Sequence, residues 1–346
     1  MRFLRRVLPF VVFGLIAPGV AAKDEPSPGV IAASVAEVVA LADPVTGQLK
    51  TFEAGTVGWL YEGPAGLLFA PDLIAGKTTV FNLRAVAVAD RIDGVTVPHF
   101  GPKLPDRYIV VAGDVLMVSY PDRAVIGTVE AEIDYPWQVV MISDSVLLAL
   151  EKGPLGEGPT YLSAVDMVSR QIVYRRKLPD SVGRIGLSRE FGLLVYTDAA
   201  SGAVRLVDPA TLSPVLTLAT AGPANDAVFL DSIKMLAAVS PSGKGGGELR
   251  LWKLKAKKGE LSVKKEESAA LDGIPLRIAH SPAEDLLAVA FEGGRIDVIS
   301  LDSLEVVRTF ELPAAPRDVV WCDPSRPGPM APEWSSDSPP ELRMDP

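Results

Sequence analysis

The sequence predicts an all-β fold assembled from repeats, and three observations support this prediction. First, short β-branched runs bounded by Gly, Asp and Pro recur along the chain, which is typical of strands joined by hairpins. Second, residues 191–218 (FGLLVYTDAASGAVRLVDPATLSPVLTL) match residues 285–312 (DLLAVAFEGGRIDVISLDSLEVVRTFEL) piece by piece. Third, 30 glycines and 30 prolines supply the residues that many tight turns require. Self-similarity at a fixed period indicates a repeat architecture.

The repeat can be followed through the chain by the residue that ends the second apolar run of each unit. The equivalent positions are Asp43, Asn82, Tyr120, Asp166, Asp208, Lys253 and Ser300. The intervals between them are 39, 38, 46, 42, 45 and 47 residues, close to the roughly 40–45 residues of a four-stranded propeller blade. Seven such positions predict a seven-bladed β-propeller of four-stranded antiparallel blades, with an extra loop over residues 85–107.

The two ends of the repeat region are expected to complete one blade together. Only two strands fit before Asp43, at 29–34 and 35–41, and one strand, at 319–322, follows the last outer strand at 304–310. Placed as the inner strand of the first blade, residues 319–322 close the ring. Closure of this kind leaves only short, protected sheet edges.

Residues 1–22 have the composition of a secretory signal peptide. Three arginines precede an apolar stretch at 7–17, and small residues close the segment. A membrane anchor is the less favoured alternative, because a spanning helix needs about 20 apolar residues. We therefore expect a periplasmic or secreted protein whose propeller domain covers 23–322. A proline-rich tail at 323–346 is expected to be disordered, because it has few aliphatic residues to bury.

Charge and the scarcity of His and Cys narrow the classes of function. The chain is 48% hydrophobic with a net charge of −9, which becomes −12 without residues 1–22. This acidic balance disfavours nucleic acid as a partner, because affinity for it rests on Lys and Arg. With only His99, His280 and Cys322, no internal disulfide can form and a multi-histidine metal centre is disfavoured. We expect no cofactor, no metal and no membrane span after signal cleavage, and we expect His280 and Cys322 to be packed in the core.

Three segments carry a resemblance to known repeats. SGAVRLVDP at 201–209 and GGELRLWKL at 246–254 are similar to the third strand of WD-type repeats. HSPAEDLLAVA at 280–290 is similar to a turn of those repeats and of the related YVTN-type bacterial surface repeats. The dipeptides at the Trp-Asp position of the family are Val207-Asp208 and Trp252-Lys253.

The resemblance extends over residues 130–322, and the chain also departs from the family pattern. The Gly-His dipeptide common in WD repeats is absent, and the turn Asp of those repeats is replaced by Ser201, Gly246 and Gly293. The resemblance therefore implies a divergent WD- or YVTN-like propeller. Such propellers serve more often as binding scaffolds than as enzymes.

Residues that enter the inner strands should surround one mouth of the central channel. The candidates at this position are Arg184, Arg277, Arg317, Asp226, Asp318, Trp137 and Gln138, with Asn225 beside them. Three guanidinium groups converging on one axis can bind an anion or a carboxylate-bearing partner through bidentate hydrogen bonds. The alternative, which we favour, is that the arginines pair with the neighbouring aspartates and loop carbonyls and only seal the channel.

The sequence thus predicts an exported, non-enzymatic propeller scaffold that binds a protein or a small anionic ligand on its axial face. The alternative is a propeller enzyme or enzyme subunit, lactonase-like or quinoprotein dehydrogenase-like. That alternative needs a cluster of metal ligands on the axis, and an arginine-rich ring disfavours a cation there. The lysines at 253, 255, 257, 258, 264 and 265 are expected to protect an exposed strand edge rather than to bind a polyanion.

Overall fold

The computed structural model describes most of the chain between residues 29 and 325. The positions left out of this range are 64–65, 73, 94, 99–106, 113, 120–124, 130–132, 134–135, 143–145, 153–157, 167, 170 and 258. The predicted signal peptide, most of the predicted tail, and His99 lie outside the described residues. No helix in the described ranges is long and apolar enough to cross a membrane.

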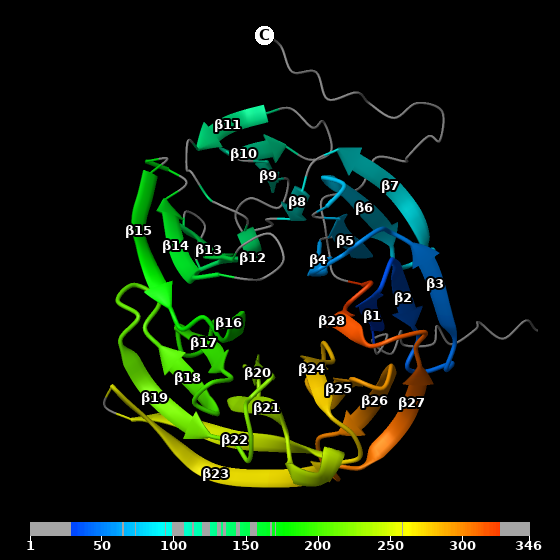
Figure 1. Cartoon of the computed structure of the whole chain (residues 1–346), viewed down its shortest axis with the longest axis vertical. Helices are drawn as coiled ribbons and strands as arrows, with labels where there is room; N and C mark the ends of the chain where they lie inside the picture. The colour runs from blue at the N-terminus through cyan, green and yellow to red at the C-terminus, as the bar shows by residue number, and fades with distance from the viewer. Residues whose placement is uncertain are drawn as a thin grey trace, which may run out of the picture.

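Strands account for nearly all the regular structure, and they form four-stranded antiparallel sheets around a central axis (Figure 1). Seven such sheets occur in the described part of the chain. Six of them are each built from four consecutive strands, whereas the remaining sheet combines β28 (Pro316–Cys322) with the first three strands. The expectation of seven equivalent blades is therefore corrected to six blades that are continuous in sequence and one closing sheet.

The closing sheet adds β1 (Val30–Val35), β2 (Val38–Ala42) and β3 (Leu49–Glu53) to β28. The first two continuous blades are β4 (Tyr61–Glu62), β5 (Leu67–Asp72), β6 (Lys77–Asn82) and β7 (Ala87–Asp93), then β8 (Val95–Pro98), β9 (Arg107–Ala112), β10 (Asp114–Ser119) and β11 (Val125–Val129). The next two are β12 (Pro136–Met141), β13 (Val146–Glu151), β14 (Thr160–Asp166) and β15 (Gln171–Leu178), then β16 (Val182–Ser188), β17 (Leu193–Asp198), β18 (Ala203–Val207) and β19 (Pro214–Ala219).

The last two continuous blades are β20 (Asp226–Leu230), β21 (Met235–Pro241), β22 (Gly247–Lys257) and β23 (Glu260–Leu271), then β24 (Pro275–His280), β25 (Leu286–Phe291), β26 (Arg295–Ser300) and β27 (Val306–Glu311). A short 3₁₀ helix, η2 (Gly243–Gly245), lies in the turn between β21 and β22. In each continuous blade the first strand lies nearest the axis, and β28 takes this place in the closing sheet (Figure 1).

The predicted pairing of the two chain ends is confirmed. β1 pairs antiparallel with β28, with Val30 opposite Cys322 and Ala33 opposite Val319. Gly29, at the entrance to β1, has a φ of +87°, and a Cβ atom there would lie 2.5 Å from the carbonyl oxygen of Cys322. Only glycine tolerates both the left-handed backbone and this close approach. The side chain of Cys322, the last residue of β28, is buried, as expected for a small apolar residue.

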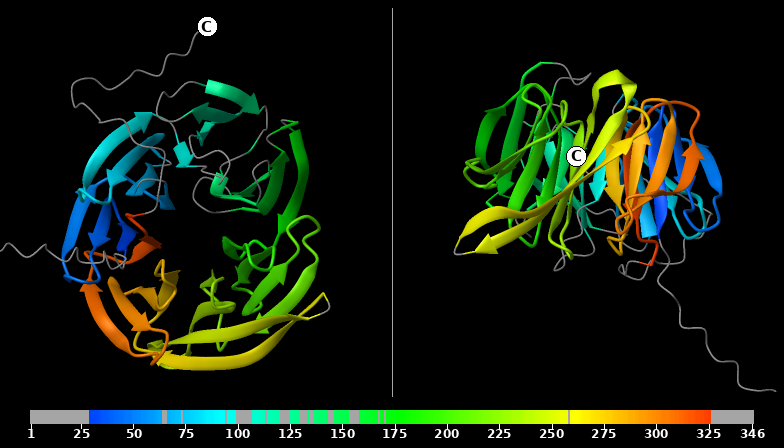
Figure 2. Two further views of the ribbon diagram at one scale, coloured as in Figure 1. Left: turned by 180° about the vertical axis from the view of Figure 1, so that it is seen from behind. Right: turned by 90° about the horizontal axis from the view of Figure 1, so that it is seen from below.

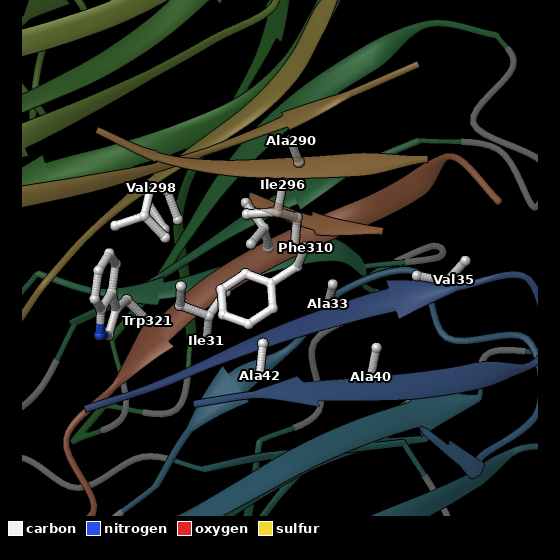
Figure 3. Packing of buried hydrophobic residues seen from close by; sticks show 13 residues of the cluster. Ile31, Ala33, Val35, Ala40, Ala42, Ala290, Ile296, Val298, Phe310 and Trp321 are labelled. Carbon is white, nitrogen blue, oxygen red and sulfur yellow. The ribbon is translucent and has the colours of Figure 1, made fainter. Parts of the chain in front are cut away.

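Apolar side chains join the closing sheet to its neighbour, the β24–β27 blade. Ile31 and Trp321 of the closing sheet meet Ile296, Val298 and Phe310 of that blade in one buried cluster (Figure 3). The second strand of a blade, such as β13, β17 or β25, is mostly apolar because both of its faces are covered by neighbouring sheets. Burying one such large side chain stabilises the fold by roughly 1.5–3 kcal/mol.

The loop predicted over residues 85–107 is corrected, because β7 and β8 occupy part of that range. The sequence does not reveal these strands because apolar and polar residues hardly alternate in this region. Strand β7 reads AVADRID, and only Ile92 in it is buried. An outer strand is exposed on one face, so its sequence need not be apolar.

The residues used to follow the repeat have a structural explanation. Where they are Asp or Asn, the side-chain Oδ1 accepts hydrogen bonds from the backbone N–H groups two and three positions later. This turn occurs at Asp43, Asn82, Asp166 and Asp208. Hydrogen bonds from backbone N–H groups hold the pKa values of Asp166 and Asp208 below their ordinary range. The pattern therefore marks a turn that stabilises itself locally, whereas Tyr120 lies outside the described residues.

Candidate axial site

The inner strands bring charged side chains together at one end of the central axis. Arg184 is the third residue of β16, Asp226 the first of β20, Arg277 the third of β24 and Asp318 the third of β28. Because these strands surround the axis side by side (Figure 1), residues near their starting ends converge. The repeat alignment therefore placed these four residues correctly at one level of the ring.

Arg184 is neutralised by two buried carboxylates. Its Nη1 atom lies 2.8 Å from Oδ2 of Asp226 and 3.7 Å from Oδ1 of Asp318. The side chains of both aspartates are 1% exposed, while that of Arg184 is 20% exposed. Burial lowers the pKa of Arg184, but the charges of Asp226 and then Asp318 outweigh it, so the net pKa is raised and the guanidinium stays charged.

The two aspartates have unequal sets of hydrogen-bond partners. Oδ2 of Asp226 also accepts from the backbone N–H of Ile278 at 3.0 Å, and its Oδ1 accepts from the N–H of Ala227 at 2.9 Å. Asp318 accepts from the N–H of Leu60 at 2.8 Å through Oδ2, whereas its Oδ1 has no hydrogen-bond donor in the described structure. Burial raises the pKa of Asp318 despite the opposing charge of Arg184.

Two aromatic residues that sequence reasoning missed fill the axis beside this charged group. Trp59, just before β4, is 4% exposed, and its ring centroid lies 5.9 Å from Cζ of Arg184 and 5.5 Å from Cζ of Arg277. These arginines belong to β16 and β24, so the indole occupies the centre of the ring between them. Tyr61 is half-buried, and burial followed by the charge of Asp318 raises its pKa.

Both aromatic residues belong to the blade whose inner strand is only two residues long. The repeat is barely recognisable in so short a strand, which explains why the alignment did not find them. A single signal was available: the sequence GWLYE at 58–62 holds two aromatic residues at the point where a blade should begin. Aromatic side chains with a polar tip often occupy such junctions.

A second group of cations lies at the same end of the axis. Nε of Arg277 donates to the carbonyl of Arg317 at 2.8 Å, and its Nη1 donates to the carbonyl of Leu276 at 2.9 Å. Burial lowers the pKa of Lys152, which follows β13; the charge of Asp180 opposes this shift, and that of Arg277 adds to it. Arg317 is exposed. We call Lys152, Arg277 and Arg317 the axial cations; none forms an ion pair with a described residue.

The remaining predicted residues connect blades or fall outside the description. Gln138 of β12 donates from Nε2 to the carbonyl of Ile185 at 2.9 Å and accepts from the N–H of Ile185 at 2.8 Å. Asn225 donates to the carbonyl of Pro275 at 2.7 Å. Both side chains therefore link neighbouring inner strands. The side chain of Trp137 lies outside the described part of the structure.

His280 ends β24 and shares a hydrogen bond of 2.9 Å between its Nδ1 and the carbonyl oxygen of Ser281. This is a local contact at the far end of the strand from the axial cations. In the described ranges, no group of three or more His, Cys, Asp or Glu side chains is arranged to hold a metal ion.

The axial residues fall into two groups. Trp59 and the paired Arg184 are largely buried, whereas the axial cations form no ion pair with a described residue and Arg317 is exposed. The alternative favoured from the sequence, in which the arginines pair with aspartates and carbonyl groups, describes Arg184 through Asp226 and Asp318. It also describes Arg277 in part, because two backbone carbonyls accept from its guanidinium, although Arg277 and Arg317 form no ion pair with a described carboxylate.

Comparison with known proteins identifies the architecture and no more. No family model matches the sequence, and no curated protein sequence is similar to it. Among solved structures, the chain is similar to the dihydro-heme d1 dehydrogenase NirN in complex with DHE, with a TM-score of 0.57 and 12% sequence identity over 86% of this chain and 76% of that one. At such low identity the similarity concerns the fold alone, and it shows that this chain is a β-propeller.

Proposed function

We propose that this β-propeller is an exported, non-enzymatic scaffold that binds the anionic group of a small ligand or of a partner protein at the axial cations. One observation carries the proposal: Lys152, Arg277 and Arg317 lie at one end of the inner strands, and none forms an ion pair with a described residue, in a chain whose net charge is −9. In an acidic protein, three such cations at one end of the central channel form a suitable binding site for a carboxylate or phosphate group.

The geometry favours binding because Arg277 is already held in place. Two carbonyl groups accept from its Nε and Nη1 atoms, and Trp59 lies against the guanidinium. A ligand therefore meets a fixed donor plane and does not have to order a mobile side chain, which lowers the entropic cost of binding. Arg184 is excluded from this role, because Asp226 already satisfies it.

Two features of the sequence support a scaffold that acts outside the cytoplasm. The resemblance of residues 130–322 to WD- and YVTN-type repeats favours binding through loops on a rigid ring. The basic and apolar start of the chain, with small residues at 20–22, favours export.

An enzyme remains the second candidate, because the similar structure is a dehydrogenase solved with its ligand DHE. A heme-like ligand carries carboxylates, which the axial cations would also accept. Absorption spectroscopy separates the two candidates: a visible band in the purified protein, or one that appears on titration with hemin, would favour the enzyme.

Isothermal titration calorimetry tests the proposed site, with inorganic phosphate, citrate and a hexapeptide with a free C-terminus as probes. We expect at least one probe to bind the unmodified protein, and the K152Q/R277Q/R317Q variant to bind it more than tenfold more weakly. The K253Q/K255Q/K257Q variant removes the same charge elsewhere and should bind as the unmodified protein does. Equal weakening in both variants would mean that only net charge matters, and the site would be rejected.

A further inference from the structure

The longest hairpin of the protein extends beyond its own sheet. β22 and β23 have 11 and 12 residues, and they pair as far as Lys257 opposite Glu260. Their neighbour β21 reaches only to Met235, which lies opposite Lys253. Residues 254–257 and 260–264 therefore form a two-stranded ribbon, which we call the hairpin arm, and Figure 2 shows it projecting past the neighbouring strands.

Apolar contacts fix the arm against the body of the propeller. Leu254 is buried and belongs, with Leu206 and Leu218 of the β16–β19 blade, to one core cluster, and Leu261 packs against this cluster. The N–H of Leu254 also donates to the carbonyl of Lys234 at 2.9 Å. The arm is thus a rigid extension of the fold, and its outward side is presented in a defined position.

The outward side of the arm, together with Lys253 at its base, carries exposed lysines. Lys253, Lys255 and Lys257 alternate along β22 and are exposed, so they share one face of the ribbon. Lys264 on β23 is exposed as well. None of these four forms an ion pair with a described residue, whereas Lys265 pairs with Glu267.

The fold does not explain the position of Lys253. It lies directly opposite Lys265 in the strand register, where like charges repel, although the ion pair of Lys265 with Glu267 offsets part of this repulsion. Protection of a free edge accounts for lysines on the outer strand β23. It does not account for Lys253, because β22 is paired on both sides at that residue. A charged residue at a position where the fold gains nothing from it is typical of a functional surface.

The composition of the arm and its base indicates what they contact. Residues 253–265 hold six lysines and one glutamate, and no arginine, Phe, Tyr or Trp. Protein interfaces are enriched in aromatic residues and Arg and depleted in Lys, and single-stranded nucleic acids are bound on stacking aromatic side chains. Binding to an anionic lipid surface needs neither arginine nor aromatic side chains, because each lysine near the surface strengthens the binding constant about fivefold.

We propose that the hairpin arm docks this protein on a membrane surface containing anionic phospholipid. Residues 253–265 have a charge of +5, and the rest of the chain has a charge of −14. The body is therefore repelled by the same surface, and docking through the projecting arm keeps it at a distance. This inference concerns a different face and different residues from the axial cations, and it does not rest on the proposed ligand.

Vesicle co-sedimentation of the full chain tests the proposal. Vesicles of phosphatidylglycerol mixed equally with phosphatidylcholine are compared with vesicles of phosphatidylcholine alone, at low and at high ionic strength. We expect salt-sensitive binding to the anionic vesicles only. The K253Q/K255Q/K257Q variant should bind on the order of 100-fold more weakly, from about fivefold per lysine, and the charge-preserving K253R/K255R/K257R variant should retain binding.

The matched control is K50Q/K77Q/R91Q, which removes three exposed cations from strands far along the chain from the arm. It should bind the anionic vesicles within about twofold of the unmodified protein, an expectation for charges that face away from the membrane. The apolar residues 7–17 are common to all variants, so they cannot produce a difference between them. No binding by the unmodified chain, equal loss in the control, or binding to heparin in place of vesicles would overturn the proposal.

Discussion

Positively charged side chains at the axis and on the hairpin arm differ in burial and in pairing. At the axis, Arg184 is four-fifths buried and lies within 4 Å of two buried carboxylates. Along the arm and its base, Lys253, Lys255 and Lys257 are exposed and form no ion pair with the residues described. The burial of a charge imposes a partner, because an isolated ion in the interior is costly. Exposure imposes none, because water solvates the charge, so the fold itself does not require partners for the lysines of the arm.

The largest effect should follow from removing the carboxylate that neutralises Arg184. Asp226→Ala leaves that guanidinium with only the more distant Asp318 and deprives the N–H groups of Ile278 and Ala227 of their acceptor. We expect a loss of about 3–5 kcal/mol in the free energy of unfolding, measured by urea denaturation. Asp226→Asn keeps the acceptor and should cost less. A loss below about 1 kcal/mol for the alanine variant would contradict a structural role for the pair.

The next largest effect should be on how the stability of the folded protein depends on pH, through the carboxyl group of Asp318. Its folded pKa is raised, chiefly by burial, so the folded state binds this proton more tightly than the unfolded state. The stabilisation is fully present below the unfolded pKa and is lost as the pH rises through the folded pKa. Relative to the unmodified protein, Asp318→Asn should therefore gain stability as the pH rises from about 4 towards 7. Thermal melting of both proteins across that range is the measurement, and a difference that does not change with pH would refute the assignment.

The smallest effect on stability should come from the lysines of the arm and its base. Replacing Lys253, Lys255 and Lys257 by Gln removes the repulsion between Lys253 and Lys265 and breaks no ion pair with a described residue. We expect the free energy of unfolding to change by no more than about 0.5 kcal/mol, in the direction of a slight gain on electrostatic grounds. Urea denaturation at low salt is the appropriate measurement. Destabilisation above about 1 kcal/mol would show that these lysines serve the fold rather than a contact outside it.

The sequence predicted the repeat because its turns and strands depend on local chemistry, and it predicted closure because the strands left over at the two ends complete one sheet. Turns such as Asp208 with its backbone partners are self-contained, and apolar inner strands reflect burial on both faces. It predicted the β4–β11 region poorly. There the inner strand β4 has only two residues, and β7 carries a polar outer-strand sequence.

The axial site was predicted in part for the same reason. Repeat alignment places residues such as Arg184 and Asp318 at one level of the ring, because that level depends only on position within a blade. It does not indicate which cation meets which acid across the ring, since partners such as Leu60 and Asp318 are 258 residues apart. Trp59 and Lys152 were missed because they lie outside strands, where the repeat carries no signal.

Closure of the ring by β1 and β28 is the claim on which the axial site depends, because Asp318 belongs to β28. A single substitution tests it, since Cys322 lies opposite Val30 in the strand register. Cross-strand partners have Cα atoms about 4.5–5.5 Å apart, within the range that a disulfide spans. Under mild oxidation Val30→Cys should form an intramolecular disulfide with Cys322, detected by non-reducing peptide mass mapping, and Ile31→Cys should form none. Failure of the first variant to cross-link, or equal cross-linking by both, would contradict the closed ring.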